Sequence, residues 1–200
     1  MSSVKISPGN TKMGAIPSVS LPSIITCRQC LCAEKCYAHK LEKLRPTVRA
    51  AYQSNLDLLK SDPETYWREV EATIMLNRYF RFHVAGDIPD ETYFRHMIAV
   101  AERNRHCEIL CFTKQYEIVN NSLTEGYCLP NNLHIIFSAW VGLEMVNPFL
   151  LPTAHVRFKD GTTTADPSAI ECGGNCTECA MTEDGCWTLK HGEQVIFNEH

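Results

Sequence analysis

The 200-residue sequence has no apolar run that approaches the ~20 residues needed to cross a bilayer. Its opening stretch, MSSVKISPGNTKMGAIPSVSLP, lacks the continuous apolar segment and the cleavage site of a secretory signal peptide. Blocks of like charge are also missing. The net charge of −4 disfavours a broad electrostatic surface for nucleic acid but leaves a local basic patch open. We therefore expect a cytoplasmic protein with no membrane partner.

Cysteine, in contrast, is abundant. The chain has eleven cysteines, an odd number, and hydrophobic residues make up 44% of it. A chain of this size and composition can bury a core without disulfide bonds. In a reducing compartment, clustered cysteines bind metals or take part in catalysis more often than they form disulfides. The cysteines are therefore the first candidates for a functional site.

Eight of the cysteines form two clusters. The stretch TCRQCLCAEKCYAH contains Cys27, Cys30, Cys32 and Cys36, and the stretch CGGNCTECAMTEDGC contains Cys172, Cys176, Cys179 and Cys186. Glycines within the second stretch permit the positive-φ turns that a chain needs to wrap around a metal. Four thiolates in either stretch suit an iron–sulfur cluster, and zinc is the alternative for the second cluster, although its spacing is not that of two symmetric zinc knuckles.

The remaining cysteine patterns favour other interpretations. Cys27 and Cys30 alone resemble a thioredoxin-like redox pair, but the two further cysteines nearby weaken that hypothesis. Cys107 and Cys111 lie in or beside an apolar segment, so we expect them to be buried as small hydrophobic residues. Cys128 lies in a polar loop. The sequence leaves open whether Cys128 or His39 is a metal ligand.

Periodicity predicts an α/β fold. Strands are expected at 20–26, 78–87, 107–114, 132–140 and 153–158, with a further edge strand at 194–197; helices are expected from Pro46, from a capping box at Ser61 and Glu64, at 89–104 and at 115–123. Strands that alternate with helices indicate a mainly parallel sheet. We expect a partial or open βα barrel at 1–165, with the first cysteine loop near its start, and a cysteine-rich metal-binding tail at 166–200 packed on the same domain.

Polar residues stand at the end of each expected strand. The strand ends are Thr26-Cys27, Gly86-Asp87, Thr113-Lys114, and Ser138 with Trp140. Functional groups of parallel α/β folds gather at the carboxyl ends of the strands, so these residues predict one shared site. Ordinary turn and capping roles are the alternative for any one of them, and their repetition favours the functional interpretation.

Several segments together resemble the phage gene product 88 family. They are TCRQCLCAEKCYAHK, RPTVRAAYQSNL, RFHVAGDIPD, CFTKQ and CGGNCTECAMTEDGCW, which follow one another from about residue 10 to residue 197. The Cys-Tyr-Ala motif and the glycine–acidic and Thr-Lys strand ends are also similar in layout to radical S-adenosylmethionine proteins. In those proteins a cysteine loop follows the first strand of a partial βα barrel.

The second resemblance implies roles for individual residues. Cys32, Cys36 and one of Cys27 or Cys30 would hold a [4Fe–4S] cluster, and the four later cysteines would hold an auxiliary cluster. Gly86 and Asp87 would recognise S-adenosylmethionine, Lys114 and Ser138 would line the same site, and Asp87 and Lys114 would serve catalysis. His39 stands where the third cysteine of the radical motif is expected.

Three functions are consistent with these patterns. The leading hypothesis is an iron–sulfur enzyme, similar to radical S-adenosylmethionine enzymes, that acts on a nucleotide, nucleic-acid or metabolite substrate with an electron donor as partner. The second is a binding module stabilised by zinc or by a cluster. The third is an electron-transfer or redox-sensing iron–sulfur protein. Whether one or two clusters form stays open.

Overall fold

A computed structural model of the chain describes residues 3–27, 31–182 and 185–199. The strands are β1 (Ile6–Ser7), β2 (Ser18–Val19), β3 (Tyr79–Phe82), β4 (Glu108–Thr113), β5 (Leu133–Ser138), β6 (Thr153–Arg157), β7 (Ile170–Glu171) and β8 (Gln194–Asn198). The helices are α1 (Ser23–Thr26), α2 (Tyr37–Leu44), α3 (Pro46–Ser61), α4 (Pro63–Met75), α5 (Glu91–Arg103), α6 (Tyr116–Thr124) and α7 (Cys176–Thr182), followed by the 3-10 turn η1 (Gly185–Trp187). None of the described helices combines the length and apolar character needed to span a bilayer.

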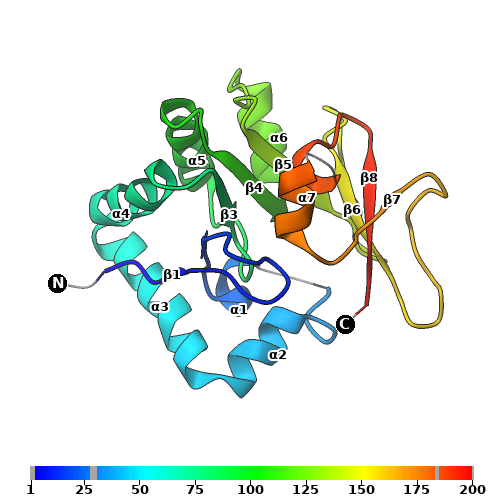
Figure 1. Cartoon of the computed structure of the whole chain (residues 1–200), viewed down its shortest axis with the longest axis horizontal. Helices are drawn as coiled ribbons and strands as arrows, with labels where there is room; N and C mark the ends of the chain where they lie inside the picture. Colours follow the sequence, from blue (N-terminus) through cyan, green and yellow to red (C-terminus); the bar gives the residue numbers. More distant parts are fainter. Residues whose placement is uncertain (1–2, 28–30, 183–184, 200) are drawn as a thin grey trace.

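The strands form one open, mostly parallel sheet in the order β1-β2-β3-β4-β5-β6-β8-β7 (Figure 1). Among the strands of the described residues, β1 and β2 pair antiparallel and the remaining strand pairs are parallel. The sheet does not close, because β1 and β7 form its two edges. The expected α/β class with a mainly parallel, open sheet is therefore confirmed.

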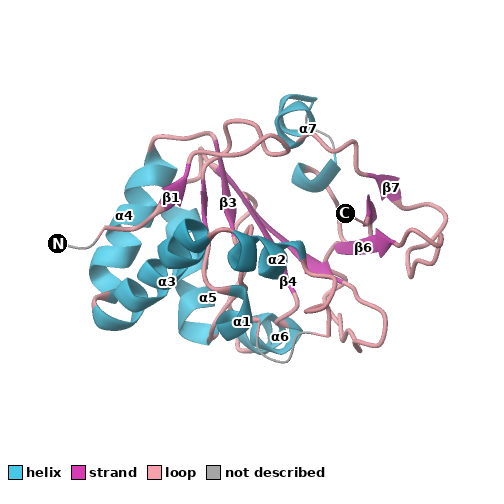
Figure 2. Cartoon of the chain, turned by 90° about the horizontal axis from the view of Figure 1, so that it is seen from below, coloured by secondary structure: helices cyan, strands magenta, loops and turns pink. Residues whose placement is uncertain are grey.

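The two faces of the sheet pack against different parts of the chain. Along β4 and β5, side chains alternate between the two faces, as the period of two requires. Ile109 and Ile135 join a core with the helices, while Leu110 and Ile136 join a second core with residues of the C-terminal segment such as Trp187. Figure 2 accordingly shows α5 and α6 on one side of the curved sheet and α7 on the other.

Three details differ from the sequence predictions. The prediction of a strand at 20–26 is wrong. The chain leaves the sheet after β2, and Pro22 precedes the helical turn α1. Helix α4 begins after Asp62, whose carboxylate accepts a hydrogen bond from the backbone of Thr65 at 3.0 Å, so the cap lies one residue later than Ser61. The strand at 194–197 is not an edge strand, since β8 lies between β6 and β7.

Strand β3 is also shorter than expected. It ends at Phe82, because His83 adopts a positive φ of 58° that extended strand residues do not.

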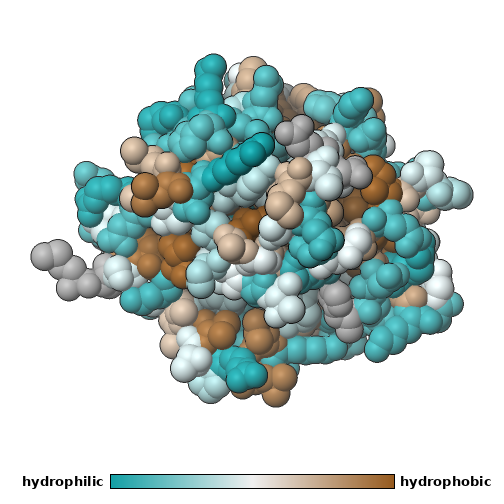
Figure 3. All heavy atoms as spheres, in the orientation of Figure 1, coloured by the Kyte–Doolittle hydropathy of each residue, from teal (hydrophilic) through white to brown (hydrophobic). Residues whose placement is uncertain are grey.

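On the face seen in Figure 3, hydrophobic side chains form separate small areas among hydrophilic ones. The large cavity described below, rather than a broad apolar surface on this face, is therefore the prominent feature of the molecule.

Candidate functional site

A cavity of about 560 Å³ lies at the carboxyl ends of the parallel strands. The segments that follow β3, β4 and β5 line it, together with the first cysteine loop and the C-terminal segment. The predicted site residues among its lining are Cys27, Cys32, Cys36, Gly86, Asp87, Lys114, Ser138, Cys172, Cys176, Cys179 and Cys186. Cys30, the other residue of the prediction, lies outside the described residues. The polar residues predicted after β3, β4 and β5 thus line one cavity.

Asp87 is held firmly in the loop that follows β3. Its carboxylate accepts hydrogen bonds from the Thr113 hydroxyl at 2.5 Å, the Lys114 backbone at 2.9 Å and the Ile88 backbone at 2.8 Å. Burial raises the pKa of this carboxyl group, and the hydrogen bond from Thr113 opposes the rise. Asp87 therefore ties the ends of β3 and β4 together where both strands meet the cavity.

Gly86 allows the first cysteine loop to approach this strand end. Its φ is +80°, and a Cβ atom there would lie 2.5 Å from the Leu21 carbonyl oxygen and 2.7 Å from the Thr26 hydroxyl. The Thr26 hydroxyl accepts a hydrogen bond from the Asp87 backbone at 2.9 Å and donates one to Pro22. Glycine is required because any side chain would push the loop that carries Cys27 away.

The first cysteine group faces Asp87 and Lys114. The pKa of Cys27 is raised to about 12 by burial and by the negative charges of Asp87 and Cys36, while Lys114 opposes the shift. Cys36 is the residue that precedes helix α2. Cys32 is buried and disulfide-bonded, so reduction must precede any metal binding through its sulfur.

The second cysteine group surrounds α7 and η1. Burial is the main cause that raises the pKa of Cys186 to about 12, and electrostatic interactions with Cys172, Cys176 and Cys179 add to it. The Gly174 backbone donates a hydrogen bond to the Cys172 sulfur at 3.4 Å. These four thiols are half-buried, and sulfur is the ligand type that soft metals prefer.

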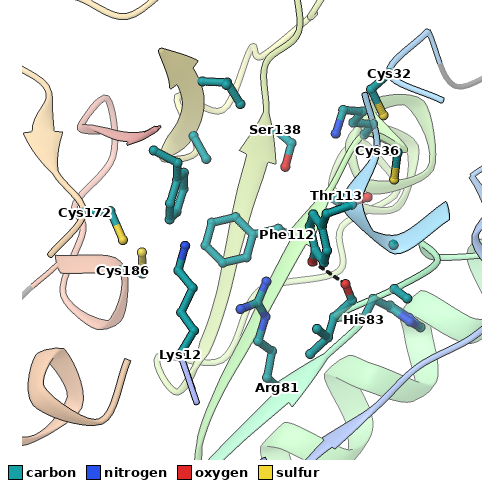
Figure 4. A pocket seen from close by; sticks show the side chains of 18 of the residues that line it. Lys12, Cys32, Cys36, Arg81, His83, Phe112, Thr113, Ser138, Cys172 and Cys186 are labelled. Carbon is teal, nitrogen blue, oxygen red and sulfur yellow. Dashed lines mark hydrogen bonds between the residues drawn. The ribbon is translucent and has the colours of Figure 1, made fainter. Parts of the chain in front are cut away.

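The two groups lie on opposite sides of the cavity. Figure 4 shows Cys172 and Cys186 on one side, Cys32 and Cys36 on the other, and Lys12, Arg81 and Phe112 between them. Within the described ranges, no group of three or more His, Cys, Asp or Glu side chains is already arranged to hold a single metal ion. A metal centre would therefore draw the thiols of either group closer together.

Arg81 and His83 line the cavity but were not among the predicted site residues. His83 is 3% exposed, its pKa is lowered to about 3 by burial and by Arg81, and neither ring nitrogen has a hydrogen-bond partner among the described residues. The available signal was the alternation in RYFRFHV, which puts Tyr79, Arg81 and His83 opposite Phe80 and Phe82.

Other expectations for single residues have clear outcomes. Cys107 and Cys111 are fully buried, as expected for small hydrophobic residues. His39, half-buried on α2, and Cys128, exposed in its loop, do not line the cavity. Ser138 does line it, and its carbonyl accepts a hydrogen bond from the Tyr116 hydroxyl that fixes the end of β5.

A sequence model of the family described as gene product 88 matches residues 3–146. The chain belongs to the gene product 88 family. The match includes the first cysteine loop and the strand ends at Asp87, Lys114 and Ser138. It ends before the C-terminal cysteines, so the gene product 88 match covers one side of the cavity and not the other. No curated protein and no solved structure matches this chain.

Proposed function

We propose that this gene product 88 protein is an iron–sulfur enzyme that resembles radical S-adenosylmethionine enzymes. The observation that carries the proposal is the gathering of seven of the eight clustered cysteines around one cavity. The curved open sheet, which we interpret as a partial βα barrel, supports it, because such folds place cofactors at the carboxyl ends of their strands.

We favour an iron–sulfur cluster, with a zinc ion as the alternative at the C-terminal cysteines. A tetrahedral zinc site needs four sulfurs at ~2.3 Å from one ion, which is a tight arrangement. An iron–sulfur cluster is larger than a single ion, so its thiolate ligands stand farther apart. The raised pKa values of Cys27 and Cys186 mean that both thiols are neutral until a cation compensates their charge.

The strand ends would position the cofactor and the substrate. A reduced cluster would supply one electron, and S-adenosylmethionine would accept it and serve as the source of the radical. Gly86 leaves room for close approach to the backbone, Asp87 fixes the cavity floor, and Lys114 provides a positive charge whose nitrogen lies 5.8 Å from the Trp140 ring centre. Aromatic walls such as Trp140 and Phe112 would exclude water from the reacting groups.

Anaerobic purification followed by iron and sulfide analysis and electron paramagnetic resonance tests the proposal. We expect iron with sulfide, a loss of iron in C176S and C36S, and unchanged iron in C128S, the matched control from an exposed loop. Zinc without iron would contradict the cluster. A fully loaded protein that neither binds nor cleaves S-adenosylmethionine would contradict the radical chemistry alone.

A second candidate function is redox sensing. The disulfide at Cys32 supports it, because this residue lines the cavity and its bond must break before its sulfur binds a metal. A redox sensor should change its metal content when it is oxidised and reduced, with no need for a substrate. Reversible loss of iron on mild oxidation, with no cleavage of S-adenosylmethionine, would favour this function over the enzyme.

A further inference from the structure

The cavity carries an excess of positive charge although the chain is acidic overall. Its charged lining consists of Lys12, Lys35, Arg81, Lys114, Asp87 and Glu199, and the whole chain has a net charge of −4. The Asp87 carboxylate already accepts three internal hydrogen bonds. Glu199 forms an ion pair with Lys35 at 3.4 Å and accepts a hydrogen bond from the Lys159 backbone. The acidic lining groups are therefore engaged within the protein.

Arg81 has no such partner. No carboxylate of the described residues forms an ion pair with it, and its Nε atom is buried without a hydrogen-bond partner there. The centre of its guanidinium group lies 4.9 Å from the ring centre of Phe112, which holds the group in place from the neighbouring strand. Arg81 is half-buried, and an oriented guanidinium group is matched to the two oxygens of a phosphate or carboxylate.

We propose that Arg81, with Lys12 beside it, binds the phosphate or carboxylate group of a small anionic ligand in the middle of the cavity. Figure 4 shows the nitrogen ends of both side chains between the two cysteine groups. The cavity volume of about 560 Å³ is typical of pockets for metabolites and nucleotides. This inference names the substrate class of the site and in that respect rests on the proposed function.

The competing role for Arg81 is to balance the charge of the C-terminal thiolates. Its positive charge lowers the pKa of Cys176 and Cys186, against the effect of burial. If Arg81 served only the metal, its substitution would lower the iron content of the protein. The fraction of protein that kept its iron would then bind the anion as tightly as wild type. The two roles therefore differ in two separate measurements, iron content and anion affinity.

The test is calorimetry on the anaerobically purified full chain with inorganic phosphate, adenosine monophosphate and succinate as probes. We expect at least one probe to bind and R81M to weaken it by about tenfold or more, because a charge-assisted pair of hydrogen bonds is lost. R78M is the matched control, since Arg78 is exposed just before β3 and does not line the cavity. If phosphate or adenosine monophosphate binds and succinate does not, the natural ligand carries a phosphate group. If only succinate binds, the natural ligand carries a carboxylate group.

Two further variants keep the inference testable if R81M does not fold. R81K retains the positive charge but not the planar guanidinium group, and K12M removes the second cation. Each variant should therefore weaken the binding of the probe that wild type binds. Failure of all three probes to bind, or equal affinity in wild type and the Arg81 and Lys12 variants, would overturn the inference. Arg81-dependent binding in a protein without iron would leave the inference standing and overturn the proposed function instead.

Discussion

The Thr113 hydroxyl and the Asp87 carboxylate lie 2.5 Å apart and join the end of β4 to the loop that follows the neighbouring strand β3. Asp87 also accepts a hydrogen bond from the Lys114 backbone, so one buried carboxylate fixes the turns that follow both strands. Thr26 hydrogen-bonds to the backbone of the same aspartate, which adds the first cysteine loop to the network. The floor of the cavity is thus organised by one side chain.

Replacement of Asp87 by Asn should destabilise the fold by about 1–3 kcal/mol, because the amide cannot accept all of these hydrogen bonds and brings donors of its own. Chemical denaturation measures the loss. The raised pKa of Asp87 also has a consequence for pH. The folded chain binds this proton more tightly than the unfolded chain, so the contribution is complete below the ordinary aspartate pKa and is lost as pH rises through the folded pKa.

The control for this pH effect is D62N. Asp62 is an exposed helix cap, and its hydrogen bond with Thr65 lowers its pKa, so its contribution to stability has the opposite pH dependence. The stability advantage of wild type over D87N should therefore grow as pH falls. The stability advantage of wild type over D62N should shrink as pH falls. Identical pH profiles for wild type and D87N would show that Asp87 is not perturbed.

Replacement of Gly86 by Ala should cost about 2–5 kcal/mol of folding free energy. The estimate combines about 1–2 kcal/mol for the left-handed backbone with about 1–3 kcal/mol for the collision with Leu21. G126A is the matched control, because Gly126 also has a positive φ of 97° but no atom lies within 4 Å of its would-be Cβ. Equal losses in the two variants would mean that the loop moves without cost.

The buried thiols should react slowly in reduced, metal-free protein. Because the pKa values of Cys27 and Cys186 are raised to about 12, little thiolate is present at pH 8. Alkylation followed by mass spectrometry should label exposed Cys128 first, and the rates at Cys27 and Cys186 should keep rising above pH 9. Equal labelling of all three cysteines at pH 8 would contradict the burial of the two groups.

His83 should stay neutral across the physiological pH range. Its lowered pKa, about 3, means that the folded chain binds this proton less tightly than the unfolded chain. Stability should therefore fall as pH decreases from 6.5 towards 3, with a slope of up to about 1.4 kcal/mol per pH unit from this residue. H83N removes the titration and suits the positive φ, so denaturation of this variant from pH 7 to 4 should show a shallower decline.

Long periodic segments were predictable from the sequence, and short ones were not. Helices α3 and α5 and strands β4 and β5 lie where periodicity indicated, because each buries an apolar face of several residues. Strands β1 and β2 have two residues each, too few for a period to show. The interior place of β8 depends on its pairing with β7, a contact that no local pattern records.

The position of three predicted residues at one cavity follows from chain order alone. Asp87, Lys114 and Ser138 follow successive parallel strands, so they had to share one edge of the sheet. Arg81 and His83 were missed because they depend on tertiary structure: one projects from within a strand, and the other has a left-handed backbone that a histidine rarely adopts.

The place of β8 in the sheet has a consequence for biosynthesis. The cavity draws one wall from the loop after β2 and another from the segment between β7 and β8, which more than a hundred residues separate in the sequence. Because β8 holds that second wall in the sheet, the cavity cannot be complete until β8 has left the ribosome. A cofactor that used both walls could therefore be loaded only after translation, because a nascent chain stalled before residue 194 contains the cysteines of both groups but lacks the strand that holds the second wall in the sheet.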